Sequence, residues 1–525
     1  MIKPLLTATI GWVCLCGSPS RALAQVQSVE ASKPLVLTTQ PADFTLQFDW
    51  RATSDAAPRL TLPNGQVLAL QHNRLGKAPG LWQTTLLSYQ AGQNGQPPVL
   101  TKLAVNGVTV EEGQNLTGGG AAGQPVQLTV PTGSVLVRNL MARPLAKRSV
   151  ANWAGPLTYK LYKESIEKRE ELTNKTPIKT GTVEQVSYDV AYGQPGRFSL
   201  LFDGKLNVPA AGEYLFDLNM GGVAGLWIDG QPVVPMTYHD LGDPESRNVT
   251  LRAGPHDVQV LFARSWPRPG LGLFVSQADT RPQALHADGS LPEFSPVSAV
   301  LVQPDARPTL IRSFIQLPGE PHKRTHALSV GSQTGLHYSL DLNQMALLMA
   351  WKGDFADVTQ MWYERGEPQL LSPAGAVVRL VPAPALAQLG AATAAWPDSL
   401  DEKVLVYKGL VLDKAGNPTT EYTLAGSTIR DQIQPVPARQ GATANALNRT
   451  LNVAGSTPNL YCRLAAGQTI DEVAKGVYAV DDRSYYIRLD PKAPVSVRSS
   501  GGRQELLMPV SLTNGSATVS YSLEF

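Results

Sequence analysis

The chain has 525 residues, and its 45 Lys and Arg are balanced by 43 Asp and Glu. Such a balance, without a cluster of Lys or Arg, argues against nucleic acid and anionic membranes as partners. Of the 3 cysteines, only Cys462 lies beyond residue 16. One remaining cysteine excludes an intramolecular disulfide and a zinc finger, and we expect a buried structural thiol rather than a catalytic one.

The N-terminal residues have the pattern of a secretory signal peptide. Lys3 provides a positive start, residues 5–16 form an apolar run, and Ala22-Leu23-Ala24 is an A-x-A cleavage site. The run is shorter than the roughly 20 apolar residues that span a bilayer. We predict that residues 1–24 are removed and that the protein is of bacterial type. The mature chain is then exported to the periplasm, the cell surface or the medium.

Two alternatives to a cleaved signal peptide remain open, a buried N-terminal helix and a lipid anchor. Val13 and Leu15 precede the cysteines at positions 14 and 16. A lipidation site has a small residue at that place, so the anchor is disfavoured. Cleavage after Ala24 also leaves 43 basic and 43 acidic residues, a neutral mature chain.

Short alternating apolar runs fill the rest of the chain, and many of its 46 Gly and 41 Pro lie between them. This pattern is typical of sandwiches built from many short strands. Few windows keep a helical period over ten residues, and no later segment is apolar enough to cross a membrane. We predict an all-β protein with three or more jelly-roll or concanavalin-like sandwiches in tandem. The predicted domains are residues 25–146, 155–278 and 300–525, the last with two subdomains as an alternative.

The first predicted domain carries five short motifs along its strands. They are Asp43-Phe44, Gly80-Leu81-Trp82-Gln83, Asn106-Gly107-Val108, Val135-Leu136-Val137-Arg138-Asn139 and Arg143-Pro144-Leu145. Together they resemble the 3-keto-disaccharide hydrolase domain, a concanavalin-like sandwich related in shape to family-16 glycoside hydrolases. The resemblance implies this fold and an activity that cleaves oxidised disaccharides.

Catalytic residues for such an activity are hard to find in the first domain. Glycoside cleavage usually needs two facing carboxylates. Residues 51–80 offer only Asp55, His72 and Lys77 besides arginines, and the acidic pair at 111–112 follows a hairpin, where we expect solvated positions. We therefore assign no catalytic residue and favour a sandwich that has kept its scaffold without its cleft.

The second predicted domain contains four further motifs in order. They are VPAAGEYLF (208–216), LWIDG (226–230), AGPHDVQVLF (253–262) and GLGLFVS (270–276). These resemble the protective-antigen-type domain, a β-sandwich of exported glycosidases and yeast adhesins. The resemblance implies carbohydrate binding or a spacer role. The linker before this domain is LAKRSVANWAGP (145–156).

Sugar-binding members of that family carry adjacent aspartates before the LWIDG-like strand, where they hold a calcium ion. Carboxylate oxygens suit this hard cation. Here residues 219–223 read Asn-Met-Gly-Gly-Val, without a carboxylate. We expect Asp229 to form a hairpin turn and Trp227 to lie in the core, and we predict neither a metal nor a cofactor.

The third domain has a segment rich in aromatic residues, with Gly-Leu-His-Tyr at 335–338, Trp-x-Gly-x-Phe at 351–355 and Trp-x-x-Arg-Gly at 362–366. It resembles a region, without established chemistry, of exported bacterial proteins that accompanies cytochrome-c, dehydrogenase or hydrolase domains. There is no CxxCH motif for haem attachment. Aromatic faces and charged planar groups can bind sugar rings. The candidate carbohydrate-binding residues are His337, Tyr338, Trp351, Trp362, Glu364 and Arg365. The alternative is a sandwich core with a structural salt bridge of Asp354 or Arg365.

Our leading hypothesis is an exported, non-catalytic protein that binds a poly- or oligosaccharide or positions a partner enzyme on it. The first alternative is a hydrolase or lyase that acts on glycosides or 3-keto-glycosides through the first domain. The second alternative is a structural protein of the cell envelope.

Overall fold

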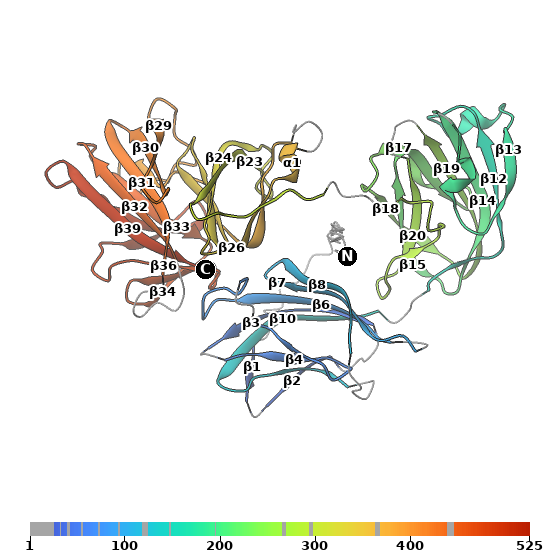
Figure 1. Cartoon of the computed structure of the whole chain (residues 1–525), viewed down its shortest axis with the longest axis horizontal. Coiled ribbons are helices and arrows are strands. Elements are labelled where there is room, and N and C mark those ends of the chain that lie inside the picture. Colours follow the sequence, from blue (N-terminus) through green and yellow to red (C-terminus); the bar gives the residue numbers. More distant parts are fainter. Residues whose placement is uncertain are drawn as a thin grey trace. The chain divides into compact units, whose positions relative to one another are not determined.

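The computed structural model describes residues 26–525 except 32, 39–42, 54–55, 72–73, 93–94, 118–123, 146–148, 195, 265–268, 293–297, 363–367 and 438–445. The predicted signal peptide therefore lies outside the described residues. The structure is 58% strand and 3% helix, and the described strands form seven sheets (Figure 1). This confirms the all-β prediction with several sandwiches. Within the described ranges, no helix has the length and apolar character needed to span a membrane.

Contacts divide the chain into two compact units. Residues 143–296 make up most of the first, which we call the insert unit. Residues 45–142 and 297–525, with the strands before residue 42, make up the second, which we call the split unit.

The insert unit is a sandwich of two antiparallel sheets. One sheet has the order β13-β12-β14-β19-β16-β17, with β11 also paired to β14, and the other has the order β18-β15-β20-β21. The strands are β11 (Asn152–Trp153), β12 (Leu157–Tyr162), β13 (Lys179–Val183), β14 (Phe198–Val208), β15 (Gly212–Met220), β16 (Gly222–Ile228), β17 (Gln231–His239), β18 (Glu245–Leu251), β19 (Gly254–Arg264), β20 (Leu271–Ser276) and β21 (Gln283–Ala284), with the short 3₁₀ helices η1 (Arg169–Leu172) and η2 (Tyr188–Ala191).

Strand alternation builds the core of the insert unit. Tyr214, Phe216 and Leu218 on β15 are fully buried, because every second side chain of a strand points to the same face. The turn between β16 and β17 has positive φ at Asp229 (50°) and Gly230 (77°). Two consecutive positive φ angles match the tight hairpin expected of an Asp-Gly pair.

The N-terminal part of the split unit is also a two-sheet sandwich. Its sheets have the orders β1-β10-β3-β6-β7-β8 and β2-β9-β4-β5. The strands are β1 (Gln27–Glu30), β2 (Leu35–Thr38), β3 (Phe44–Ala52), β4 (Arg59–Thr61), β5 (Val67–Ala69), β6 (Gln83–Gln90), β7 (Val99–Val105), β8 (Val108–Asn115), β9 (Val126–Thr129) and β10 (Ser134–Pro144). Leu46, Phe48 and Trp50 of β3 face its core.

The C-terminal part of the split unit has three sheets. Their orders are β22-β26-β25-β24-β23 with β27 on β26, β28-β33-β38-β37, and β29-β30-β31-β32-β39-β36-β35-β34. The elements are β22 (Leu301–Val302), β23 (Thr309–Ile315), β24 (Arg324–Gly331), β25 (Leu336–Asp341), β26 (Ala346–Asp357), α1 (Thr359–Trp362), β27 (Ser372–Arg379), β28 (Leu386–Gln388), β29 (Leu405–Leu412), β30 (Pro418–Leu424), β31 (Ser427–Val436), β32 (Ala446–Ala454), β33 (Leu460–Gly467), β34 (Ile470–Ala474), β35 (Val477–Val480), β36 (Tyr485–Arg488), β37 (Ser496–Ser500), β38 (Arg503–Pro509) and β39 (Ser516–Glu524).

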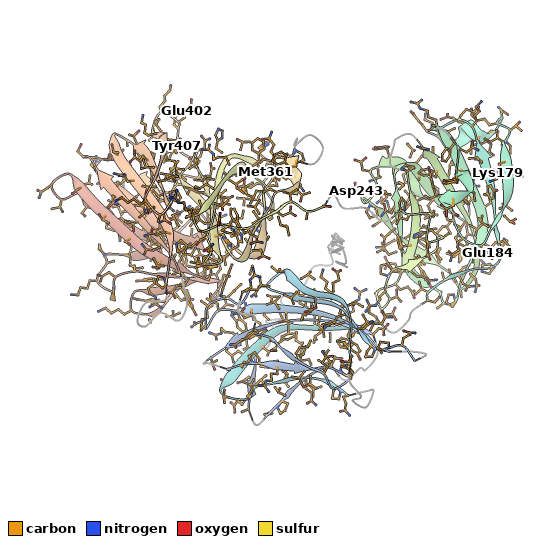
Figure 2. All side chains as sticks on the ribbon, in the orientation of Figure 1. Lys179, Glu184, Asp243, Met361, Glu402 and Tyr407 are labelled. Atoms are coloured by element: carbon orange, nitrogen blue, oxygen red, sulfur yellow. The ribbon has the colours of Figure 1, made fainter. Side chains whose placement is uncertain are left out.

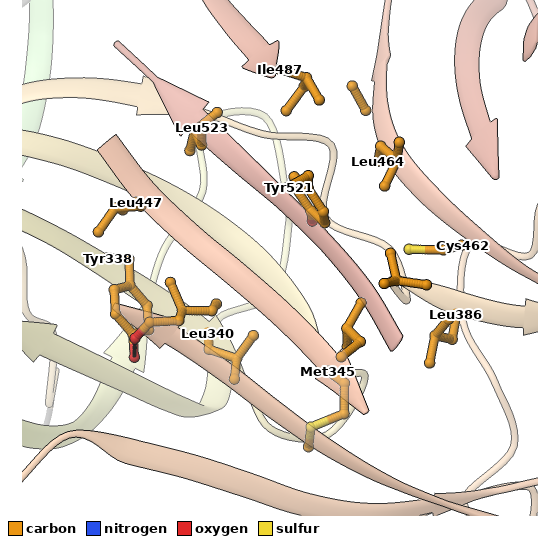
Figure 3. Close-up of a cluster of buried hydrophobic side chains, with 14 of the residues drawn as sticks. Tyr338, Leu340, Met345, Leu386, Leu447, Cys462, Leu464, Ile487, Tyr521 and Leu523 are labelled. Atoms are coloured by element: carbon orange, nitrogen blue, oxygen red, sulfur yellow. Dashed lines mark hydrogen bonds between the residues drawn. The ribbon is translucent and has the colours of Figure 1, made fainter. Parts of the chain in front are cut away.

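These three sheets share one hydrophobic core. Figure 3 shows Tyr338 of β25, Cys462 of β33 and Tyr521 of β39, one from each of the three sheets, in the same buried cluster. Cys462 is fully buried, and its burial raises the pKa of the thiol to about 12. A thiol with so high a pKa is protonated at neutral pH, which fits a structural role.

A buried ion pair lies beside this core. The guanidinium of Arg449 donates from Nε and one terminal nitrogen to both carboxylate oxygens of Asp431, at 3.0 and 2.6 Å. Its other contacts include the carbonyl of Met345 at 3.1 Å. Burial alone would lower the pKa of Arg449, but Asp431 and Tyr521 raise it well above its ordinary value. The pair joins β31 and β32 to the turn that precedes β26.

Candidate functional site

The structure buries three of the six residues predicted to bind carbohydrate. His337, Tyr338 and Trp351 expose 1%, 3% and 0% of their surface. Their polar atoms have partners inside the fold. Trp351 donates to the carbonyl of Phe355 at 2.7 Å, and Tyr338 donates to that of Ile433 at 3.1 Å.

His337 lies in an aromatic cluster under the β25–β26 hairpin. Its ring centre is 5.5 Å from that of Trp351 and 5.3 Å from that of Phe355, and these two rings stack at 5.9 Å. Nδ1 accepts from the amide of Ser332, and Nε2 donates to the carbonyl of Gly353. Burial lowers the pKa of His337 to about 4, so the ring is neutral at pH 7.

The four candidates that the structure describes do not form one surface. His337 and Tyr338 are neighbours on β25 and face opposite sides of the sheet. Trp362 ends α1 and is 74% exposed, while Glu364 and Arg365 lie outside the described residues. His337, Tyr338 and Trp351 lie in the core of the sandwich, with their ring faces covered by protein.

The outer face of the N-terminal sandwich, where an enzymatic cleft was considered, lies against the C-terminal part of the split unit. We call this contact the seam. Ala78, Leu81, Val477, Ala479 and Tyr486 form a buried cluster there. Gly80 has φ +80°, and a Cβ at this position would lie 2.7 Å from the hydroxyl of Tyr486. The Gly-x-Trp step of the first motif therefore serves close packing.

Charged groups at the seam contact one another in ion pairs. Arg138 pairs with Asp482, lies 3.5 Å from the carboxylate of Asp49, and stacks 3.9 Å above the ring of Trp82. Thr84 also donates to Asp49, at 2.9 Å. Both carboxylates thus contact the same cation, a structural use of these charges.

Of the other ionisable groups considered for catalysis, the structure describes Lys77 and the acidic pair at 111–112. Burial lowers the pKa of Lys77 at the edge of the seam. Residues 111–112 are exposed on the edge strand β8. Asp55 and His72 are outside the described residues.

The region that corresponds to the calcium loop is filled by protein groups. Met220 is fully buried, and the side-chain oxygen of Asn219 accepts from the amide of Gly242 at 3.0 Å. Asp229 accepts from His256 at 2.7 Å, as expected for a turn residue. Over the described part of the chain, no group of three or more His, Cys, Asp or Glu side chains is arranged to hold a metal. Trp227 is 8% exposed, as expected for a core residue.

A groove of about 570 Å³ lies in the insert unit, at the edge formed by β11, β21 and the segment after β13. Its volume falls within the roughly 300–1,000 Å³ typical of small-molecule sites. We call it the Trp153 groove. It is lined by Asn152, Trp153, Gly155, Val183, Glu184, Gln185, Ser187, Gln283, Ala284, Leu285 and Ala287.

Backbone pairing fixes the walls of the Trp153 groove. Val186 forms a parallel bridge with His286, and Ala287 donates its amide to the carbonyl of Val186 at 2.9 Å. The amide side chain of Gln283 accepts from Val150 at 2.7 Å and donates to Ala151 at 2.7 Å. The groove is therefore preformed by main-chain and side-chain hydrogen bonds.

The lining combines an aromatic ring with planar polar groups. Trp153 is partly exposed, and its Nε1 donates to the carbonyl of Leu285 at 3.0 Å, which orients the ring. Glu184 and Gln185 are exposed, and neither side chain has a hydrogen-bond or ion-pair partner among the residues that the structure describes. Figure 2 shows Glu184 at the margin of the unit. An aromatic face beside planar polar groups is suited to a sugar ring.

The sequence did not point to this groove. Its residues come from three segments, 152–155, 183–187 and 283–287, and none of them carries a motif. Trp153 belongs to a stretch taken as a linker. The one available signal was a tryptophan in the segment predicted to be a linker.

Comparisons with known proteins gave structural likenesses only. No family model matches the chain, and no curated protein matches it. The PA14 domain of the antifreeze protein MpAFP is similar at 14% identity, over 27% of this chain and 91% of that domain, with a TM-score of 0.23. The A domain of epithelial adhesin 9 from Candida glabrata, in complex with Galβ1-3GlcNAc, is similar at 9% identity, over 28% and 95%, with a TM-score of 0.22.

A β-glucosidase from Kluyveromyces marxianus, in complex with glucose, is similar at 16% identity with a TM-score of 0.20. The likeness covers 23% of this chain and 16% of the β-glucosidase. TM-scores this low carry no argument about function, so the functional argument rests on the groove.

Proposed function

We propose that this chain is an exported, non-catalytic carbohydrate-binding protein that holds a glycan in the Trp153 groove. The observation that carries the proposal is the partly exposed Trp153 ring beside Glu184 and Gln185 in a preformed concave site. The ring stacks on the C–H face of a sugar, and the carboxylate and amide bind its hydroxyls. Export rests on the signal-peptide pattern of residues 1–24.

Binding is favoured over catalysis because the described lining of the groove has too few carboxylates for hydrolysis. Hydrolysis by paired carboxylates needs two of them across the bond, and Glu184 is the one carboxylate that lines the groove as described. The enzymatic alternative through the N-terminal sandwich is not favoured, because Asp49 and Asp482 at the seam both contact Arg138.

Affinity electrophoresis of the full mature chain in gels containing plant and bacterial polysaccharides tests the proposal. We expect retardation by at least one polysaccharide, and the variants Glu184→Ala and Gln185→Ala should each weaken it about tenfold, equivalent to about 1.4 kcal/mol of binding energy. Both side chains are exposed, so these variants should fold as the parent does. Trp153→Ala should abolish retardation.

Trp362→Ala is the matched control, because Trp362 is an exposed tryptophan outside the groove. It should leave retardation unchanged. If no polysaccharide retards the parent chain, or if the groove variants bind as the parent does, the proposal fails. If Trp362→Ala alone loses binding, the site lies at α1 instead.

A further inference from the structure

The charge that lines the Trp153 groove is negative. Of its eleven lining residues, as far as the structure describes them, Glu184 is the one ionisable side chain, and no Lys or Arg lines the groove. The remaining polar groups are amides and a hydroxyl, from residues such as Asn152, Gln185 and Ser187. Among the lining residues that the structure describes, a ligand therefore meets one carboxylate and no cation.

Lys179 lies on β13, the strand just before Glu184, and its ammonium group makes its contacts elsewhere. The ammonium group of Lys179 donates to the carbonyl of Val190 at 3.1 Å and lies over the ring of Tyr159. Lys179 precedes Glu184 by five residues, and it is not among the residues that line the groove. Figure 2 shows the two residues at separate ends of this edge. Arg281, two residues before Gln283, is not among the lining residues.

A second carboxylate lies close to one wall. Asp189 follows the 183–187 segment, and one of its carboxylate oxygens would be 2.5 Å from a Cβ placed on Gly289. Gly289 is two residues beyond the lining residue Ala287. Asp189 thus adds a second carboxylate on the side of the 287–289 turn.

We propose that the Trp153 groove selects neutral glycans and rejects acidic ones, such as polyuronates. This selectivity rests on the proposed function of the same groove. The two oxygens of Glu184 accept hydrogen bonds from two neighbouring hydroxyls of one sugar, while the Trp153 ring covers a C–H face. A sugar carboxylate or sulfate at that place would face Glu184 directly, and like charges across an interface are strongly unfavourable.

Affinity electrophoresis with a matched polysaccharide panel tests the selectivity. The neutral gels contain galactomannan or a mixed-linkage β-glucan, and the acidic gels contain polygalacturonate or alginate at the same mass concentration. We expect retardation in at least one neutral gel and none in the acidic gels. Retardation in an acidic gel equal to or stronger than in the neutral ones overturns the selectivity while leaving glycan binding intact. Lack of retardation in every gel overturns the proposed function and the selectivity together.

Charge reversal provides the second arm. Glu184→Lys should gain retardation in polygalacturonate, by at least roughly tenfold in apparent affinity, and lose it in the neutral gels. Glu213→Lys makes the same change in net charge at an exposed residue of β15 that does not line the groove. We expect no gain for this control. An equal gain in both variants would show a nonspecific charge effect and overturn the proposal.

Discussion

The guanidinium carbon of Arg138 lies 3.9 Å from the centre of the Trp82 ring. The same guanidinium pairs with Asp482, which is 344 residues away in the chain. Arg138 thus joins the N-terminal sandwich to the C-terminal part of the split unit, through a stacking contact on one side and an ion pair on the other.

Replacement of Arg138 should loosen the seam. We expect Arg138→Ala to lower the free energy of opening around residues 77–82 and 477–486 by about 1–3 kcal/mol, since it removes a cation–π contact and a charged hydrogen bond. Arg138→Lys should not restore it, because an ammonium group lacks the planar fork that both stacks and pairs. Hydrogen exchange measured by mass spectrometry reports the opening. Arg59→Ala, an exposed arginine of β4, is the control, and equal deprotection in both variants would contradict the role of Arg138.

The buried pair of Asp431 and Arg449 should be sensitive to loss of one partner. Asp431→Asn leaves the guanidinium buried without its counter-charge, so we expect a loss of about 3–5 kcal/mol in unfolding free energy. Glu421 pairs with Arg430 at the surface, and Glu421→Gln should cost at most about 1 kcal/mol. Urea denaturation of both variants measures the difference. Similar losses would refute the distinction between the buried and the exposed pair.

His337 should contribute a pH dependence to stability. Its pKa is about 4 in the folded chain and about 6.5 in an unfolded one. Between these values the unfolded chain binds the extra proton, so stability is complete above pH 6.5 and falls as the pH drops toward 4. The full loss is about 3 kcal/mol. Unfolding free energies from pH 7 to 4 for the parent and His337→Gln check this, with the exposed His326→Gln as control. A parallel pH profile for the parent and His337→Gln would contradict it.

The two candidate tryptophans of the C-terminal part should differ in their effect on folding. Trp351 is fully buried, and Trp351→Ala should cost about 3–5 kcal/mol. Trp362 is 74% exposed, and Trp362→Ala should change stability by less than about 0.5 kcal/mol. Thermal unfolding followed by circular dichroism compares the two. A large loss for Trp362→Ala would show that this ring packs in solution.

The fold class followed from the sequence because strand alternation is local. In β15, Tyr214, Phe216 and Leu218 occupy every second position, and the structure buries all three. The carbohydrate-binding candidates were harder to judge, because His, Tyr and Trp serve equally in a sugar site and in an aromatic core. Their spacing does not reveal which face of a strand is covered.

Sites assembled from distant segments left no trace in the sequence. The Trp153 groove needs Trp153, Glu184 and Gln283 side by side, and long-range pairing around residues 186 and 286 brings the last two segments together. Contacts across the seam are likewise distant in the chain. The apolar residues Ala78 and Leu81 gave no sign that their partners lie near residue 480.

The seam also has a consequence for the order of events during synthesis. The N-terminal sandwich emerges first, but its apolar patch at Ala78 and Leu81 finds its partners only after the chain has been made through Tyr486. Contacts so far apart form slowly, because a long loop must close before they form. Until then the nascent protein exposes apolar surface, the kind of surface that chaperones bind. The N-terminal sandwich therefore completes its packing only after the C-terminal part has been synthesised.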